Sequence, residues 1–250
     1  MGHTGEDSEA IDVALAVTWT ELDAASRLVH NCYVRCGYVK PSSDGRHVSP
    51  YLAMPSTVVF VARANGAIVA TVSLIADSAQ RLPCDALWAS DLAALRASGR
   101  RIAEVSALAV SEAWRGSSLR VLRTLVRAVG VYGRDIAGVD TLCVAVNPRH
   151  APFYEALLRF QHFGPLKPCH AVNGAPAVGL YVDLSGLDDR LDERFAAGVF
   201  SPDGRRNMRA SLWRDLLRLR PRRLKVLHGL RQARHVRRRG DESVLGSRAP

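Results

Sequence analysis

The sequence AVNPRHAPFYEALLRFQHFG, residues 145–164, passes from an apolar strand into a helix and then toward a further strand. Pro148 stops the first strand, because proline has no backbone N–H to donate to a sheet. Pro152 is tolerated only in the first turn of a helix, so we expect the helix to begin near His150 or Ala151. This junction predicts one unit of a mixed α/β layer structure.

The remainder of the chain alternates strands and helices in the same manner. Apolar and β-branched runs flank Asn65-Gly66 and again Asn173-Gly174, and such turns are strongly typical of β-hairpins. Three further strands are predicted at 13–18, 101–110 and 139–146, and three further helices at 20–38, 82–99 and 117–133.

Two helices carry more detailed expectations. Thr20 is the expected N-cap of the first, with Asp23 completing an imperfect capping box. The apolar face of the helix at 117–133 is predicted to comprise Leu119, Leu122, Val126 and Val129.

This order predicts an α/β domain at residues 12–184, with a mixed central sheet flanked by helices. The strands at 101–110 and 139–146 are joined through a helix, so they should lie parallel, with a right-handed crossover. We expect a flexible N-terminus at 1–11 and a basic helical extension at 185–250 whose end is disordered.

The charge is concentrated in that extension. The net charge is +10, and residues 185–250 hold 17 Lys+Arg against 8 Asp+Glu. Pro221 separates two predicted amphipathic helices. The first places Leu212, Leu216, Leu217 and Leu219 on or near one face, and the second places Leu224, Leu227 and Leu230 together.

Three interpretations of the extension remain open. It could be a solvated helical segment that packs on the body. It could instead contact an acidic protein or an anionic membrane. Nucleic acid is the least favoured partner, because Trp213 is the single aromatic residue among the arginines and no DNA or RNA motif appears.

Composition narrows the class of protein further. No apolar run reaches the length of a membrane span, and the polar, acidic first residues do not resemble a secretory signal, so we expect a cytoplasmic protein. The five cysteines are odd in number and scattered, which does not indicate a disulfide framework. Neither metal-ligand spacing nor a Ser-His-Asp order is present, and no metal is expected.

The strand EVSALAV, residues 104–110, places a carboxylate among apolar residues. Strict alternation would put Glu104, Ser106, Leu108 and Val110 on one face. Glu104 has two interpretations. It could pair with Arg100 or Arg101 at the strand end, or it could act as a general base whose pKa is raised by partial burial.

Three strings carry a family resemblance. EVSALAV at 104–110, VNPRHAPFYEALL from Val146 and AVNGAPAV from Ala171, in this order of elements, resemble the FeeM-type N-acyl amino acid synthases of the GNAT superfamily, which are related to the acyl-homoserine lactone synthases. The likeness covers residues 12–184. It implies a GNAT-like fold and transfer of a fatty acyl chain from an acyl carrier protein thioester to an amino acid. No cofactor is implied beyond the phosphopantetheine arm that carries the donor.

The resemblance also implies roles for individual residues. Glu104 would take a proton from the acceptor ammonium. Backbone amides near Ala109, Val110 and Ser111 would polarise the thioester carbonyl. Tyr154 would protonate the leaving thiolate, although a space-filling tyrosine bonded to a backbone carbonyl is an equal alternative. Ala107 stands where the lactone synthases have an arginine.

The donor loop departs from the coenzyme A pattern. Arg115, Gly116 and Ser117 lead into a helix whose positive end can hold a phosphate, but Ser118 and Arg120 replace the small residues that admit a pyrophosphate. A carrier-protein donor is therefore favoured over free coenzyme A. The other expected substrate-binding residues are Ser106, Asn147, Arg149 and Phe153.

Two rival functions remain. One is a coenzyme A-dependent GNAT N-acetyltransferase. The other is a non-catalytic GNAT-like module whose basic extension binds nucleic acid.

Overall fold

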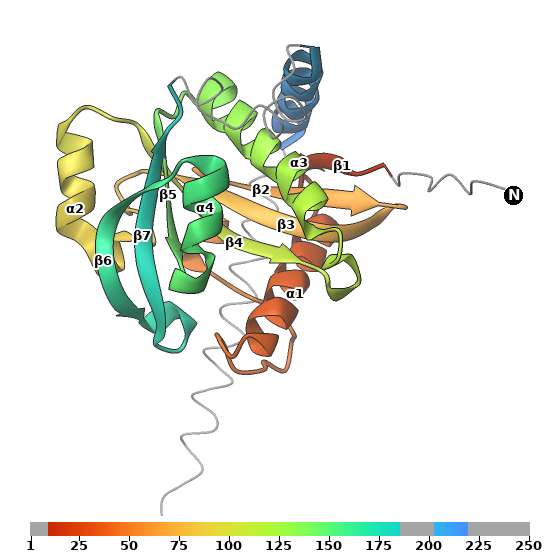
Figure 1. Ribbon diagram of the computed structural model, residues 1–250. Coiled ribbons are helices and arrows are strands. Elements are labelled where there is room, and N and C mark those ends of the chain that lie inside the picture. The colour runs from red at the N-terminus through yellow and green to blue at the C-terminus, as the bar shows by residue number, and fades with distance from the viewer. Residues whose placement is uncertain (1–9, 186–202, 220–250) are drawn as a thin grey trace, which may run out of the picture.

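The computed structural model describes residues 10–185 and 203–219 (Figure 1). The strands are β1 (Asp12–Leu15), β2 (Thr57–Ala64), β3 (Ala67–Ala76), β4 (Ile102–Val110), β5 (Thr141–Val146), β6 (Gln161–Cys169) and β7 (Ala175–Asp183). The α-helices are α1 (Trp19–Arg35), α2 (Asp85–Ala97), α3 (Ser118–Val131) and α4 (Ala151–Leu158). Short helical turns are η1 (Pro50–Ala53), η2 (Glu112–Trp114), η3 (Tyr132–Ile136), η4 (Pro148–His150) and η5 (His170–Val172). A further helix spans residues 203–219, and we call it the C-terminal helix.

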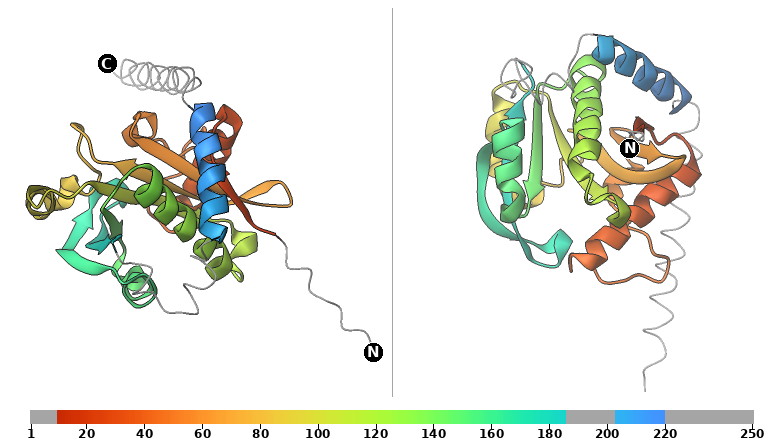
Figure 2. Two further views of the ribbon diagram at one scale, coloured as in Figure 1. Left: turned by 90° about the horizontal axis from the view of Figure 1, so that it is seen from above. Right: turned by 45° about the vertical axis from the view of Figure 1, so that its right-hand side comes forward.

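All seven strands form one sheet in the order β1-β2-β3-β4-β5-β7-β6. The β4–β5 pair is parallel and every other neighbouring pair is antiparallel, as the α3 crossover predicts. Apolar residues of α3, α4 and the C-terminal helix pack on one face, and those of α1 and α2 pack on the other (Figures 1 and 2). The predicted mixed α/β sheet flanked by helices is therefore confirmed.

Both predicted hairpin turns are present. Asn65 and Gly66 have φ values of 49° and 77°, and Asn173 and Gly174 have φ values of 57° and 74°. Asparagine and glycine tolerate this left-handed conformation, which two-residue hairpins require. The helix after Asn147 likewise begins at Ala151, where Pro152 indicated.

The start of α1 differs from the prediction. Thr18, and not Thr20, is the N-cap, and its hydroxyl accepts the Glu21 N–H at 3.2 Å. The Glu21 carboxylate accepts the Thr18 N–H at 2.8 Å, which completes the capping box. Asp23 instead pairs with Arg27. The strand β1 also ends earlier than predicted, at Leu15, three residues before the Thr18 N-cap.

The apolar face of α3 was predicted in part. The prediction is wrong for Leu119, because its side chain lies in the first turn and is 51% exposed. Val121 and Leu125 instead form the row that packs into the core. Leu122, Val126 and Val129 form the adjacent row, and they line a cavity described below.

The C-terminal helix confirms the first of the two helices predicted in the extension. Leu212 and Leu219 join the main apolar core, and the Asp215 carboxylate accepts the Leu15 N–H at 3.1 Å. Leu217 was predicted near the apolar face, but it is 51% exposed because Leu212 and Leu219 occupy the side that meets the body. The second predicted helix and residues 1–9 lie outside the described residues, and the domain boundaries at 11/12 and 184/185 stay predictions.

Candidate active site

The parallel pair β4–β5 stays together for only three residue pairs. Ile102, Ala103 and Glu104 pair with Thr141, Leu142 and Cys143, and no pairing follows. Both strands continue, to Val110 and Val146. The sheet therefore opens between two parallel neighbours, and Glu104 is the last β4 residue before the opening.

A bulge changes the alternation of β4 after Glu104. Ser106 pairs with Ser73 and Ala109 with Thr71, so β4 contains one more residue than β3 in this interval. Ala107 lies at the bulge with φ of 52°, which is uncommon for alanine. Such left-handed conformations in non-glycine residues concentrate at functional sites.

Because of the bulge, the predicted alternation of side chains along β4 is wrong after Ser106. Leu108 and Val110 pack with the α3 face of the sheet, together with Val105, and do not share the face of Glu104. Ala107 and Ala109 pack against α1 instead. One extra residue reverses the side on which every later side chain lies, so strict alternation fails beyond Ser106.

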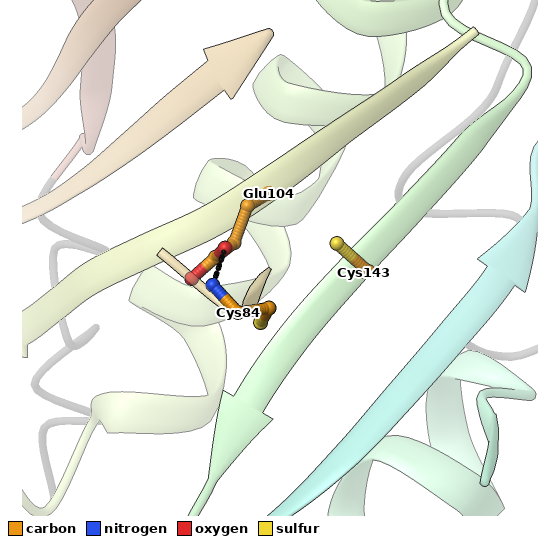
Figure 3. Close-up of side chains that lie close together, drawn as sticks. All are labelled: Cys84, Glu104 and Cys143. Atoms are coloured by element: carbon orange, nitrogen blue, oxygen red, sulfur yellow. Dashed lines mark hydrogen bonds between the residues drawn. The ribbon is translucent and has the colours of Figure 1, made fainter. Parts of the chain in front are cut away.

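Glu104 is buried, with only 2% of its surface exposed. Its Oε2 accepts the backbone N–H of Cys84 at 2.7 Å, and the Cys84 and Cys143 side chains lie beside it (Figure 3). The surface-pair alternative is wrong, because Arg100 binds Asp183 at 2.7 Å and Arg101 binds Asp140 at 3.0 Å.

Burial raises the pKa of Glu104 to about 7, because the ionised form loses its hydration. The N–H and thiol of Cys84 bond to the carboxylate and offset part of this effect, while nearby Asp85 adds to it. A carboxyl group with this pKa exists in both forms near neutral pH, which suits proton transfer.

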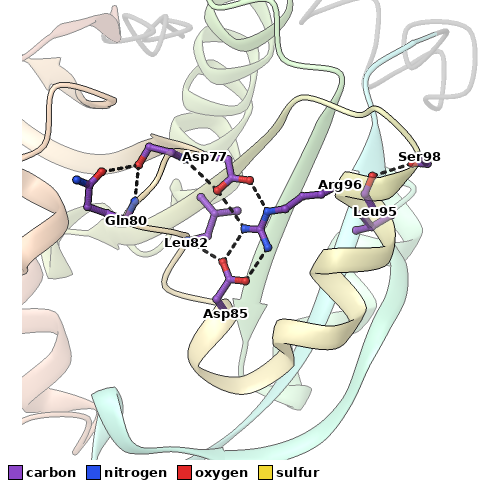
Figure 4. Close-up of polar contacts among 8 residues, drawn as sticks. Asp77, Gln80, Leu82, Asp85, Leu95, Arg96 and Ser98 are labelled. Carbon is purple, nitrogen blue, oxygen red and sulfur yellow. Dashed lines mark hydrogen bonds and ion pairs between the residues drawn. The ribbon is translucent and has the colours of Figure 1, made fainter.

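An ion-pair network holds the segment that carries Cys84. The Arg96 guanidinium donates to both oxygens of Asp85, at 2.7 and 2.6 Å, and also bonds Asp77 at 2.5 Å (Figure 4). Asp85 in turn accepts the Leu82 N–H at 2.8 Å. These contacts tie the residues before α2 to the end of β3, and so place the Cys84 N–H against Glu104.

Within the described residues, one group of side chains could hold a metal ion, and it consists of Cys84, Glu104 and Cys143. Their donor atoms lie within 4.8 Å of one another. Metal binding requires thiolates, but burial raises the pKa of Cys84 well above its ordinary value. A hydrogen bond with Cys84 lowers the pKa of Cys143, but burial and the nearby carboxyl groups of Glu104 and Asp85 together outweigh it, so the net shift is upward. The trio therefore fits a hydrogen-bonded carboxyl group better than a metal centre.

An apolar cavity lies on the opposite face of β4 from Glu104. Its empty space is about 650 Å³, including open solvent at its mouth. Its lining side chains are apolar apart from that of Tyr154, and they come from β3, β4, α3, β5, α4, β7 and the residues that flank α4 and β7. It comprises Val72, Val105, Leu108, Leu122, Leu125, Val126, Val129, Gly130, Leu142, Phe153, Tyr154, Leu158, Phe160, Val182 and Leu184.

Two predicted site residues line this cavity. Phe153 and Tyr154 lie in the first turn of α4, with their rings 5.5 Å apart and edge to face. Tyr154 is buried, and burial raises its pKa to about 12. Its hydroxyl therefore remains protonated across the ordinary pH range.

The backbone amides predicted to polarise the carbonyl are only partly available. The Ser111 N–H donates to the Val69 carbonyl at 2.8 Å, so this donor is already used by β3. Successive N–H groups of a strand point in opposite directions, so the Val110 N–H points away from β3, toward the opening. Val110, and not Ser111, is thus placed to meet an oxygen there.

The donor loop lies at the start of α3. Ser117 is the N-cap residue, but its side chain makes no capping hydrogen bond. Arg115 is exposed beside Glu112, and a Cβ on Gly116 would meet nothing within 4 Å. Packing within the described residues therefore does not require a glycine at position 116, while the first-turn N–H groups keep the positive end of the helix.

Asn147 and Arg149 shape the start of α4. The Asn147 side chain accepts the Arg149 N–H at 3.2 Å and so caps η4. Arg149 reaches across to the Tyr38 hydroxyl at 3.2 Å, which ties this corner to the segment after α1. Ser106, half-buried on β4, lies on the Glu104 side of the sheet.

Sequence reasoning missed Tyr33 and the two cysteines. Tyr33, at the end of α1, packs with Ala107 and Ala109 of β4. Burial raises its pKa, and Tyr154, Tyr38, Cys169 and Glu104 raise it further, so the hydroxyl lies near both predicted catalytic groups. No local motif indicates these residues, because α1, α2 and β5 meet Glu104 only in the folded sheet.

The opened mixed sheet, the buried carboxyl group and the apolar cavity define a GNAT-like acyltransferase. The family described as N-acyl amino acid synthase FeeM matches residues 24–183. The chain belongs to this family, as the three strings of the sequence indicated.

Solved structures agree with this assignment. The chain is 30% identical to FeeM, an N-acyl amino acid synthase from uncultured soil microbes, with 74% of this chain and 96% of that chain covered and a TM-score of 0.63. Two acyl-homoserine lactone synthases share the fold. LasI is 17% identical, with 70% and 91% of the two chains covered and a TM-score of 0.54. BjaI is 20% identical, with 72% and 89% covered and a TM-score of 0.51. None of the curated proteins matches the chain.

Within the described residues, no helix is both long enough and apolar enough to cross a membrane.

Proposed function

We propose that this acyltransferase moves a fatty acyl chain from an acyl carrier protein thioester to the amine of an amino acid. One observation carries the proposal. Glu104 is buried at the last β4–β5 pair, and the sheet opens directly after it onto an apolar cavity on the other face. An amine on the Glu104 side and an acyl chain on the cavity side would meet in this opening.

The chemistry begins with the acceptor. Its ammonium gives one proton to the ionised Glu104, and the freed nitrogen lone pair attacks the thioester carbonyl carbon. The Val110 N–H stabilises the oxyanion that forms. The C–S bond then breaks, the thiolate takes a proton from Tyr154, and the second proton of the nitrogen restores the Tyr154 hydroxyl. The products are an amide and a thiol, and Glu104 gives the proton that it took to water.

The cavity supports a long acyl chain over an acetyl group. An acetyl group would leave most of its apolar lining without contacts. Each buried CH₂ contributes about 0.8 kcal/mol, equivalent to roughly a fourfold gain in affinity. The affinity for the acyl chain should therefore rise with its length until the cavity is filled.

The surface around the start of α3 supports a carrier-protein donor. Leu119 is 51% exposed at the start of α3, and Arg115 and Arg120 are exposed beside it. A large apolar side chain among arginines suits an acidic protein that carries a phosphopantetheine arm. The arm has one phosphodiester, and a single helix N-terminus can accept it.

To test this proposal, the purified protein is supplied with two kinds of donor that carry the same acyl groups. Acyl carrier protein and coenzyme A, each loaded with acyl groups of two to sixteen carbons, would be incubated with a mixture of the twenty amino acids. Mass spectrometry should detect long-chain N-acyl amino acids, formed faster from the carrier-bound donor. Preferential use of acetyl-coenzyme A would instead support the N-acetyltransferase alternative.

A variant of the donor surface sharpens this test. Leu119→Glu places a negative charge where an acidic carrier protein should dock, and it should slow transfer from the carrier at least tenfold. Transfer from acyl-coenzyme A should fall much less. An equal loss with both donors would contradict a carrier surface at this position.

A further inference from the structure

The C-terminal helix presents an apolar pair that neither the core nor the proposed reaction uses. Trp213 and Leu217 are 46% and 51% exposed. They are four residues apart, so their side chains are neighbours on one face of the helix. Leu212 and Leu219 lie on the other side, where they are buried against the body.

Arginines surround this apolar pair. Arg206, Arg209, Arg214 and Arg218 are all exposed along the same helix. Within the described residues, Arg206 pairs with Asp203 at 3.3 Å, and both side chains are largely exposed, so this interaction is weak. The other acidic residue of the helix, Asp215, is buried and accepts the Leu15 N–H, and its second oxygen lies 3.8 Å from the exposed Arg218 guanidinium. The outward face is therefore cationic around two large apolar side chains.

The helix is held in this orientation from both ends. Arg205 donates to the Asp135 carboxylate at 2.7 Å, and Asp215 accepts the Leu15 N–H. Both views of Figure 2 show the helix lying beside α3 and β1. The surface is thus fixed on the folded body and needs no rearrangement to be presented.

We propose that Trp213, Leu217 and the surrounding arginines form a docking surface for an anionic lipid membrane. Tryptophan and leucine insert at the boundary between head groups and acyl chains, while arginines attract anionic head groups. Residues 220–250 add ten Lys+Arg against two acidic residues, which favours the same partner. The surface goes beyond the acyl-transfer reaction and involves none of its residues.

The position of the helix argues against the carrier protein as the occupant. Asp135, which anchors Arg205, follows the C-terminal end of α3, whereas the donor loop precedes its N-terminal end. With 14 residues, α3 is about 21 Å long. The Asp135 end of the C-terminal helix therefore lies about 20 Å from the donor loop.

Vesicle co-sedimentation of the full chain tests this proposal. Vesicles of phosphatidylcholine alone would be compared with vesicles containing phosphatidylglycerol, at low and high salt. We expect at least tenfold tighter binding to the anionic vesicles, weakened by salt. Trp213→Ala with Leu217→Ala should weaken that binding at least tenfold. Arg209→Glu with Arg214→Glu should weaken it at least twentyfold, since each surface cation contributes about 1 kcal/mol, or roughly fivefold.

Matched measurements keep the result interpretable. Leu166→Ala removes a leucine that is 62% exposed on β6, and it should bind vesicles as the parent protein does. All variants should keep the parent melting temperature and the parent rate with a carrier-bound donor. Undiminished vesicle binding by both double variants would overturn the proposal. Loss of transfer from the carrier with unchanged vesicle binding would assign the surface to the carrier protein instead.

Discussion

The two faces of β4 carry different chemistry, although they belong to one strand. Toward α1 and α2, the strand presents Glu104 among thiols and tyrosines. Toward α3 and α4, it presents Val105, Leu108 and Val110 beside an apolar cavity. In an intact sheet the two faces would be separated by backbone. Here β5 leaves β4 after Glu104, so the proton-transfer group and the apolar cavity border the same opening.

The difference teaches how a sheet can join two incompatible environments. A carboxyl group needs polar contacts to be kept in place, and a fatty chain needs none. The protein puts each on its own face and lets them meet only where pairing stops. The predictions that follow test the polar face and the apolar face.

Glu104→Gln should have the largest effect. The amide keeps the size and can accept the Cys84 N–H, but it cannot take a proton, so kcat should fall about 10²- to 10⁴-fold. Steady-state rates with a carrier-bound donor measure this. Glu155→Gln is the matched control, because its carboxylate contacts His162 at the surface and lies outside the site. A turnover within threefold of the parent would remove Glu104 from the mechanism.

The pH dependence should follow the same group. The base must be ionised, so kcat/KM should fall tenfold for each pH unit below about 7, reaching roughly a hundredfold at pH 5. A profile that stays flat from pH 5 to 8 would contradict a base with this pKa.

Stability should respond with a definite sign. The folded pKa of about 7 lies above the ordinary value of 4.5, so the neutral carboxyl favours folding below pH 4.5, and this advantage is lost as pH rises through 7. The full difference corresponds to about 3 kcal/mol. Glu104→Gln should therefore be more stable than the parent at pH 8 but not at pH 4, as denaturant titrations at both pH values can measure.

Filling the apolar face should change specificity and not the chemistry. Val126→Phe adds a ring to the cavity lining, so we expect kcat/KM for a sixteen-carbon donor to fall about ten- to hundredfold, at the 0.8 kcal/mol lost per displaced CH₂. A short donor should be affected less than threefold. Thr124→Phe places the same ring on the outer side of α3 and should leave both rates unchanged.

Tyr154→Phe should have the smallest effect. A thiolate is a good leaving group, so loss of the proton donor should lower kcat less than tenfold, provided that the ring still packs against Phe153 and Phe160. Tyr181→Phe is the control, because that hydroxyl bonds Gln161 at the surface. A loss above a hundredfold would mean that Tyr154 does more than assist departure of the thiolate.

Much of the fold was predictable because its signals are local. Asn-Gly turns specify their own backbone conformation, and Pro148 and Pro152 mark the end of a strand and the start of a helix within a few residues. The parallel β4–β5 pair followed from the helix that joins them. Prediction failed at Thr20 because Thr18 and Glu21 make a better capping box, and at Leu108 because a bulge at Ala107 is not visible in an alternating pattern.

The sequence by itself determined the order of strands and helices, the family, and the presence of a carboxylate in the strand at 101–110. Only the tertiary structure decided what surrounds that carboxylate. Cys84, Cys143 and Tyr33 come from three elements separated by long stretches of chain, and they meet Glu104 because the sheet and its two covering helices bring them there. The pKa of Glu104 depends on the water that these neighbours exclude, and exclusion of water is a property of packing that no short stretch of sequence contains.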